Sequence, residues 1–193
     1  MAISFMDLVY GCVAHAGEPE QEVRSLTTSS FQNRAPMASR RSKDAVALSS
    51  VFCSGQFAGM MLAIGFAQTA AQTLPEQSWT LRQQSDDAVF RKLMPIVFLL
   101  NALTLGFAFG TSQKQSRLWF GVAEALVVAT FVETMAINVP INVRVGGWTA
   151  GSAPATWTHE RDRWLETHWV RTALGSLSFL CALAGEHYRA DAG

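Results

Sequence analysis

Four long apolar segments, separated by polar stretches, dominate the pattern of the chain. They cover residues 45–72, 93–110, 118–139 and 166–185. Each has about the length that a helix needs to cross the hydrocarbon core of a bilayer, which takes roughly 17–25 residues. The short polar turn after the second segment requires an antiparallel return. We therefore predict an all-α fold, an integral membrane antiparallel four-helix bundle.

The N-terminal part of the chain differs from the rest. Residues 1–44 are rich in Ser, Thr, Arg and Gln and show no sustained apolar period, which is typical of segments that do not fold by themselves. We predict a disordered N-terminal extension over 1–44 and a four-span transmembrane domain over 45–193. The basic residues just before the first span favour a multi-pass topology with both termini in the cytosol.

Composition excludes several classes of function. Hydrophobic residues make up 49% of the chain and charged residues 16%, against roughly 25% charged in an average soluble domain. The net charge is zero and the basic residues lie in the predicted loops, so no nucleic-acid partner is expected. The four histidines lack metal-site spacings such as H-x3-H, and we predict no metal site. A lipid bilayer is the partner that the composition indicates.

The first apolar segment carries a small-xxx-small pattern at Gly55 and Gly59. Such a pattern lets another helix approach closely. Because the same chain supplies other spans, we predict packing against a neighbouring helix of the bundle rather than a dimer contact. The sequence leaves the oligomeric state open.

Amides surround a proline at the end of the third predicted span, in the sequence Asn138-Val-Pro140-Ile-Asn142. Proline lacks an N–H and its ring disfavours the preceding helical turn, so the carbonyl of Ala136 should be freed there. We predict that the proline breaks the helix and that the two amides form a polar notch.

A second polar group lies on the fourth predicted span. Trp157, Trp164, His168 and Arg171 follow one another at intervals of 7, 4 and 3 residues, and this spacing places them along one helical stripe. Because the third and fourth spans are consecutive, the stripe and the amide notch can reach the same level of the bundle.

Each of these groups also has a purely structural interpretation. Asn138 and Asn142 can cap the broken helix, and Arg171 can pair with Glu133 to join two helices. His168 can be a hydrogen-bonded interfacial histidine. The alternative to an enzyme is therefore a non-catalytic membrane scaffold, or a subunit that binds a lipid or a partner protein.

The order of these motifs resembles the anthrone oxygenase family, also described as a domain of unknown function with four membrane helices. The resemblance rests on the Asn-x-Pro-x-Asn motif, on Trp148 and Trp157, and on the run from Arg161 to Thr172 that holds Trp164, His168 and Arg171. Together with the glycine-bearing first span it covers residues 45–186. The N-terminal 44 residues have no counterpart in the family.

The resemblance implies a small membrane enzyme that oxidises an anthrone to an anthraquinone with O2, as a tailoring step in polyketide biosynthesis. The substrate would be a small aromatic polyketide, and neither flavin nor metal is implied. Together, the residues and the resemblance predict a cofactor-independent monooxygenase.

Roles for individual residues follow from this chemistry. We predict that His168 is the base that removes the acidic proton of the anthrone, with Glu133 as the alternative base. Arg171, Asn138 and Asn142 would donate hydrogen bonds to the developing oxyanion. The predicted binding surface for the aromatic substrate is formed by tryptophans: Trp164, Trp157 and Trp148.

Overall fold

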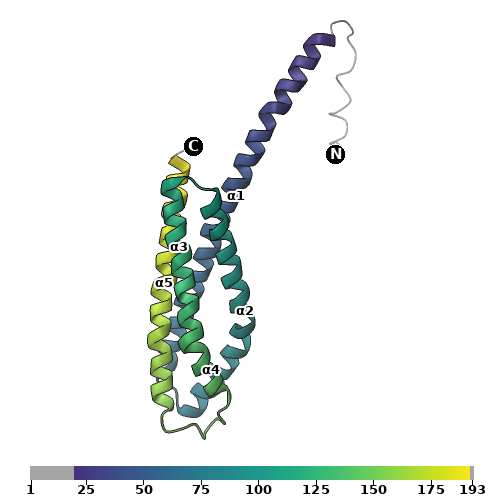
Figure 1. Cartoon of the computed structure of the whole chain (residues 1–193). Coiled ribbons are helices and arrows are strands. Elements are labelled where there is room, and N and C mark those ends of the chain that lie inside the picture. The colour runs from purple at the N-terminus through teal and green to yellow at the C-terminus, as the bar shows by residue number, and fades with distance from the viewer. Residues whose placement is uncertain (1–19, 192–193) are drawn as a thin grey trace, which may run out of the picture. The chain divides into compact units, whose positions relative to one another are not determined.

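The computed structural model describes residues 20–191, and all regular structure within them is helical. The helices are α1 (Glu20–Ala71), α2 (Glu76–Thr111), α3 (Lys114–Glu133), the π-helical turn η1 (Thr134–Asn138), α4 (Val139–Gly146) and α5 (Trp157–Asp191) (Figure 1). The predicted all-α fold is confirmed.

The chain divides into two units, Met1–Arg41 and Ser42–Gly193. In the first unit, the structure describes residues 20–41 as the N-terminal part of α1. The structure describes only part of the segment 1–44, for which we predicted a disordered extension. Residues 1–19 lie outside the described residues, whereas residues 20–44 have a helical backbone continuous with the first apolar segment.

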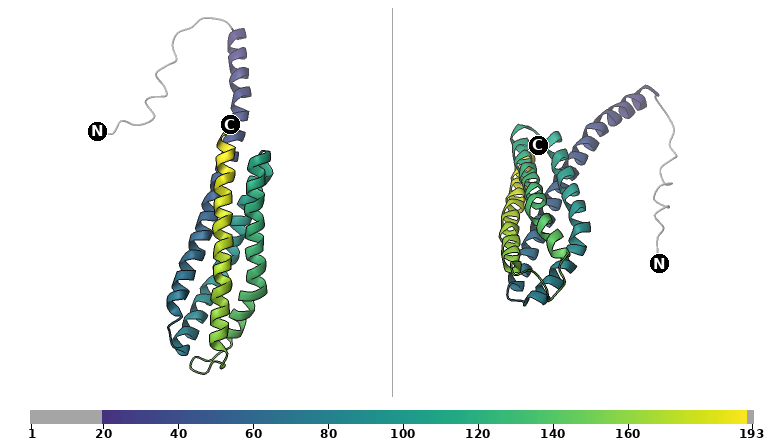
Figure 2. Two further views of the ribbon diagram at one scale, coloured as in Figure 1. Left: turned by 90° about the vertical axis from the view of Figure 1, so that its left-hand side faces the viewer. Right: turned by 60° about the horizontal axis from the view of Figure 1, so that its bottom comes forward.

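The second unit is an antiparallel four-helix bundle, as predicted (Figure 2). Helix α3, the turn η1 and α4 follow one another without a break and form a single helical rod. Hydrogen bonds and aromatic contacts join neighbouring rods. Between α1 and α2, Ser54 Oγ donates to Asn101 Oδ1 at 2.8 Å, and between α5 and α3, Ser178 Oγ donates to the carbonyl of Ala123 at 2.9 Å.

Three helices are long and apolar enough to cross a membrane: Asp44–Ala71, Glu76–Thr111 and Lys114–Gly146. They contain the first three predicted spans, except for Gln72 at the end of the first, and they fit a membrane protein. The fourth predicted span, 166–185, lies in α5, which is not among these candidates.

The mean hydropathy of the apolar part of α5 is lower than that of the three candidate spans because polar residues of α5 face the inside of the bundle. His168, Arg171 and Ser178 are buried, whereas Val170 and Leu180 on its outer side are exposed. α5 packs directly on α3. Over residues 168–180, the buried side of α5 is polar and its exposed side is apolar, as is found in helices of membrane bundles that carry inward-facing polar residues.

The polar stretch between the first two apolar segments, residues 73–92, is helical over most of its length. After a short turn, α2 begins at Glu76 and runs through this segment into the second apolar run. The reason is that its polar residues have partners inside the bundle: Trp79, Thr80 and Gln83 are buried, and Gln83 bonds to side chains of α1 and α4.

The helix break predicted at Pro140 is wrong. The rod continues to Gly146 because the turn η1 changes the hydrogen-bond register just before the proline. In this turn the N–H of Val139 donates to the carbonyl of Thr134, five residues earlier. The wider π-turn accommodates a residue that has no N–H.

Gly55 marks a close contact between α1 and α5. A Cβ atom at Gly55 would lie 3.1 Å from the Phe179 ring, whereas one at Gly59 would meet no atom within 4 Å. The predicted close packing against a neighbouring helix is therefore found at Gly55. Gly59 does not contribute to it.

Candidate functional site

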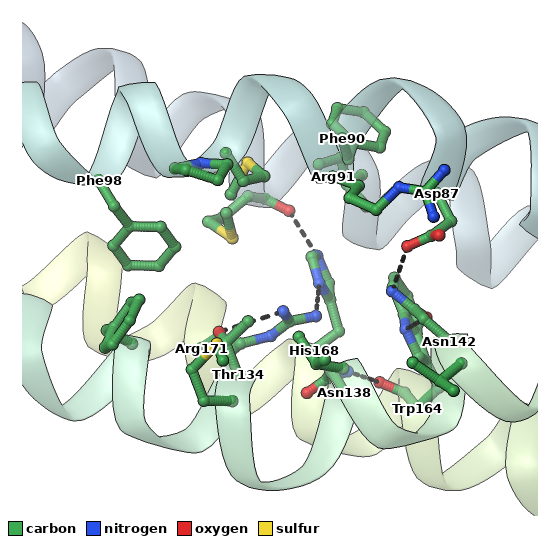
Figure 3. A pocket seen from close by; sticks show the side chains of 18 of the residues that line it. Asp87, Phe90, Arg91, Phe98, Thr134, Asn138, Asn142, Trp164, His168 and Arg171 are labelled. Atoms are coloured by element: carbon green, nitrogen blue, oxygen red, sulfur yellow. Dashed lines mark hydrogen bonds between the residues drawn. The ribbon is translucent and has the colours of Figure 1, made fainter.

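A cavity of about 540 Å³ lies between α2, the α3–α4 rod, α5 and the C-terminal half of α1 (Figure 3). Its size falls within the range of roughly 300–1,000 Å³ typical of sites for small organic ligands. Most of the lining is apolar, including Met61, Met94, Phe98, Phe131, Met135 and Val143. The polar part of the lining consists of Asp87, Asn138, Asn142, Trp164, His168 and Arg171, together with Arg91 and Thr134.

Trp164 and His168 present two stacked rings to the cavity. Their ring centroids lie 5.0 Å apart and their planes are inclined by only 4°. The stack is fixed at both ends, because the indole Nε1 of Trp164 donates to Asn142 Oδ1 at 2.8 Å and His168 bonds to α1. The paired rings provide a rigid aromatic surface beside the apolar lining.

Both ring nitrogens of the buried His168 have partners. Nε2 lies 2.9 Å from the carbonyl oxygen of Met61, which can only accept, so Nε2 carries the proton. Nδ1 lies 2.8 Å from Nη2 of Arg171, which can only donate, so Nδ1 accepts. The two partners together select the neutral tautomer with the proton on Nε2.

Arg171 is held on several sides by neighbouring residues. Its Nε lies 3.4 Å from Glu133 Oε2, its Nη1 donates to Thr134 Oγ1 at 3.4 Å, and its guanidinium lies 5.4 Å from the centre of a Trp164 ring. The pairing of Arg171 with Glu133 that the sequence suggested is present. Glu133 itself is not among the residues that line the cavity.

The two amides of the Asn-x-Pro-x-Asn motif are engaged with protein groups. Asn138 Nδ2 donates to the backbone carbonyl of Trp164 at 3.3 Å, and Asn142 Nδ2 donates to Asp87 Oδ1 at 2.9 Å. Asn138 also accepts a hydrogen bond from Thr167 at 3.2 Å. These amides position Trp164 and Asp87 and join the α3–α4 rod to α5 and α2.

Comparison with known proteins agrees with this arrangement. Residues 87–181 match the family model described as anthrone oxygenase. Over these residues the chain is a member of the anthrone oxygenase family. Neither a curated protein nor a solved structure matches the chain. The resemblance predicted over residues 45–186 is thereby confirmed over residues 87–181, and this region contains all five predicted site residues that line the cavity.

The anthrone oxygenase region brings most of the predicted site together. Five of the eight predicted residues line the cavity: Asn138, Asn142, Trp164, His168 and Arg171. Glu133 reaches it only through Arg171. Trp148 and Trp157 do not line it and lie against Trp79 instead, at ring-centroid distances of 6.3 and 6.0 Å. Trp79, in the first turn of α2, is buried, and Trp148 and Trp157 pack against the same apolar cluster.

Two charged residues that line the cavity were missed by the sequence analysis. Asp87 and Arg91 belong to α2, in the polar stretch between the first two apolar segments. Their separation by four residues was the available signal, since it places both on one face of a helix. Within residues 42–190, no group of three or more His, Cys, Asp or Glu side chains is arranged to hold a metal ion.

Proposed function

We propose that this protein is a membrane anthrone oxygenase that converts a polyketide-derived anthrone to an anthraquinone with O2. The observation that supports this most is the cavity of about 540 Å³, which is mostly apolar and carries a stacked Trp164–His168 pair and the Arg171 guanidinium on its wall. A planar tricycle with one carbonyl group needs such a combination. The family match of residues 87–181 supports the same reaction.

The reaction can proceed without an external reductant. Loss of a proton from C10 of an anthrone leaves the electron pair on carbon, and the anion is stabilised because it is an aromatic anthranolate. This electron-rich anion transfers electrons to O2 and forms a C10–O bond, which gives a hydroperoxide after protonation. Loss of water from the hydroperoxide gives the quinone, so one anthrone and one O2 yield one anthraquinone and one water.

The protein would hold the substrate in position and stabilise the negative charge that develops on it. Trp164 offers the face on which the tricycle stacks, and Asn138 and Asn142 keep this ring in place. Arg171 has more N–H groups than the partners described above occupy, and the remaining ones can stabilise the anthranolate oxygen. Flavin and metal are not part of this proposal, because the substrate anion itself supplies the electrons to O2.

The two residues predicted as the base are less well placed for proton removal than the predicted hydrogen-bond donors are for their role. His168 lines the cavity, but its Nδ1 lone pair accepts from Arg171, so a base role for His168 requires Arg171 to release it when substrate binds. Glu133 lies beside Arg171 and outside the cavity lining. Its carboxylate is placed to balance the guanidinium charge.

A membrane location suits this substrate class. Anthrones are apolar and collect in bilayers. The apolar exteriors of the helices would place the protein, and with it the cavity, in the bilayer where the substrate is dissolved. We propose a multi-pass protein in which α5 is the fourth membrane helix and both ends of the bundle, near residues 44 and 186, face the cytosol. Reporter fusions at the two ends should give the same cytosolic signal, and opposite signals would contradict this topology.

The test of the enzyme proposal is quinone formation by the full-length protein purified in detergent. With an anthrone under ¹⁸O2, and after treatment with a chelator, the protein should form quinone faster than a protein-free blank. The new quinone oxygen should carry ¹⁸O, and the second atom should leave as water. A folded protein that does not exceed the blank would refute the proposal.

The same contacts also favour a second candidate, a non-catalytic scaffold. Both ring nitrogens of His168 are satisfied by protein groups, and Arg171 is paired with Glu133, as expected if these residues only lock helices together. On this alternative the cavity would hold a lipid chain, and no anthrone-dependent O2 consumption would be measured. Oxygen uptake with and without anthrone separates the two candidates.

A further inference from the structure

Asp87 lies where two cavities meet. It lines the main cavity and also a second one of about 220 Å³ between α2 and α4. The second cavity has a mostly polar lining that includes Gln83, Gln84, Arg91 and Asn142. Asp87 is therefore a carboxylate with apolar substrate space on one side and hydrogen-bonding groups on the other.

A chain of hydrogen bonds fixes how Asp87 is presented. The indole Nε1 of Trp164 can only donate, so the atom of Asn142 that it contacts at 2.8 Å must be the amide oxygen. Gln83 Nε2 donates to the same oxygen at 3.1 Å. The NH2 group of Asn142 is thereby directed to Asp87 Oδ1, at 2.9 Å.

The second carboxylate oxygen of Asp87 is left available. Among the residues that the structure describes, Oδ1 accepts from Asn142 and no side chain donates to Oδ2. His168 differs in this respect, because both of its ring nitrogens are engaged. A proton acceptor needs a free lone pair, and Asp87, a residue that lines the cavity, has one on Oδ2.

We propose that Asp87 is the base that removes the C10 proton, and this inference rests on the proposed anthrone oxidation. The C10–H bond breaks, its electron pair remains on the ring, and the proton moves to Oδ2 of Asp87. Asn142 keeps the carboxylate oriented during the transfer. Asp87 then returns this proton to the peroxide anion formed at C10, which gives the hydroperoxide, and the proton leaves in the water released when the hydroperoxide breaks down.

The positions of Asp87 and Arg171 suit the two ends of the substrate. They lie on opposite sides of His168 along the cavity (Figure 3). In an anthrone, C10 and the carbonyl carbon face each other across the central ring. With C10 toward Asp87, the carbonyl oxygen points toward Arg171, where the developing negative charge is stabilised.

The experiment isolates proton removal from the oxygen step. The full-length protein is incubated with an anthrone in D2O without oxygen, and exchange at C10 is followed by NMR. Asp87→Asn keeps an acceptor for Asn142 and removes the base, so protein-dependent exchange and quinone formation should each fall by about 100-fold or more. The matched control is Asp86→Asn, because Asp86 bonds to Gln68 and Arg82 and does not line the cavity. It should exchange like the wild type.

Binding of anthraquinone, measured by difference absorbance, shows whether the cavity is intact. We expect Asp87→Asn to bind anthraquinone like the wild type. Exchange that is unchanged in Asp87→Asn, while His168→Gln loses it, would overturn the inference and assign the base to His168. Loss of anthraquinone binding in Asp87→Asn would also overturn it, because Asp87 would then be a structural group. If the wild type forms no quinone, the proposed anthrone oxidation itself is refuted, whichever residue is the base.

Discussion

Trp164 and Asn142 are joined by a hydrogen bond of 2.8 Å between the indole Nε1 and the amide oxygen. This bond connects α5 to α4 and holds the aromatic wall of the cavity against the helix that follows Pro140. It also sets the direction of the amide, and through it the position of Asp87. One contact therefore links the architecture of the bundle to the polar part of the cavity.

Removing the indole N–H should show how much that hydrogen bond contributes to the free energy of unfolding. Trp164→Phe keeps an aromatic ring and leaves Asn142 without its best donor, so we expect the free energy of unfolding to fall by about 1 kcal/mol. Trp119→Phe is the matched control, since Trp119 stacks on Tyr188 at the other end of the bundle. Thermal unfolding in detergent should show the loss only for Trp164→Phe, and equal shifts would contradict this assignment.

His168→Ala should destabilise the bundle whether or not His168 takes part in catalysis. The substitution leaves the Met61 carbonyl and Arg171 Nη2 without this partner, and each unmatched buried group costs about 1–3 kcal/mol. Chemical unfolding monitored by circular dichroism gives the difference. His159→Ala, at an exposed position at the start of α5, serves as the control and should leave stability unchanged. An unaltered midpoint for His168→Ala would mean that these contacts do not form in solution.

Two glycines four residues apart on α1 should respond differently to the same change. At Gly55 a side chain would press on Phe179 at 3.1 Å, whereas at Gly59 it would meet nothing within 4 Å. Gly55→Leu should therefore cost about 1–3 kcal/mol through overpacking, and Gly59→Leu should cost little. Equal losses of folded protein after heating would show that the α1–α5 approach is looser than described.

The ion pair between Arg144 and Glu160 should make stability depend on pH in the acid range. Arg144 donates to both carboxylate oxygens of Glu160, at 3.0 and 2.7 Å, and this hydrogen bonding holds the pKa of Glu160 below its usual value. Because the folded pKa is lowered, the stabilisation is present above the unfolded pKa of about 4.3. It is lost as the pH falls through the lower folded value.

Comparison with Glu160→Gln isolates this contribution. The pair lies near the surface, so the wild type should exceed the variant by at most about 1 kcal/mol at pH 7. The difference should shrink as the pH falls below the unfolded value and disappear at a pH well below the lowered pKa of Glu160. A difference that persists at that pH, or one that grows as the pH falls, would contradict the assignment to the Glu160 carboxylate.

Much of the bundle could be predicted because its apolar segments have the length of membrane helices. The meeting of the Asn-x-Pro-x-Asn motif with Trp164, His168 and Arg171 also followed from local rules, since helical spacing places the last three on one stripe and a short connection brings the two helices together. These residues do line one cavity. The prediction needed only the helical periodicity of each segment and the order of the segments along the chain, both of which can be read from the local sequence.

The first turns of α2 could not be predicted in this way. Gln83 and Asp87 look like parts of a polar loop in the sequence, and they face inward because Asn142 on α4 and Gln68 on α1 supply partners. Tertiary hydrogen bonds therefore decide the structure of this segment. The tolerance of Pro140 has a similar origin, in a π-helical turn that the pattern of residues does not reveal.

The central claim is that anthrone oxidation takes place in the cavity beside Trp164, and blocking that cavity tests it most directly. Gly146 lines the cavity and Gly106 is exposed on α2, and a Cβ atom at either would meet no atom within 4 Å. Quinone formation is compared for the wild type, Gly146→Trp and Gly106→Trp. We predict the wild-type rate for Gly106→Trp and a rate near the protein-free blank for Gly146→Trp. Equal rates for the two variants would contradict the claim.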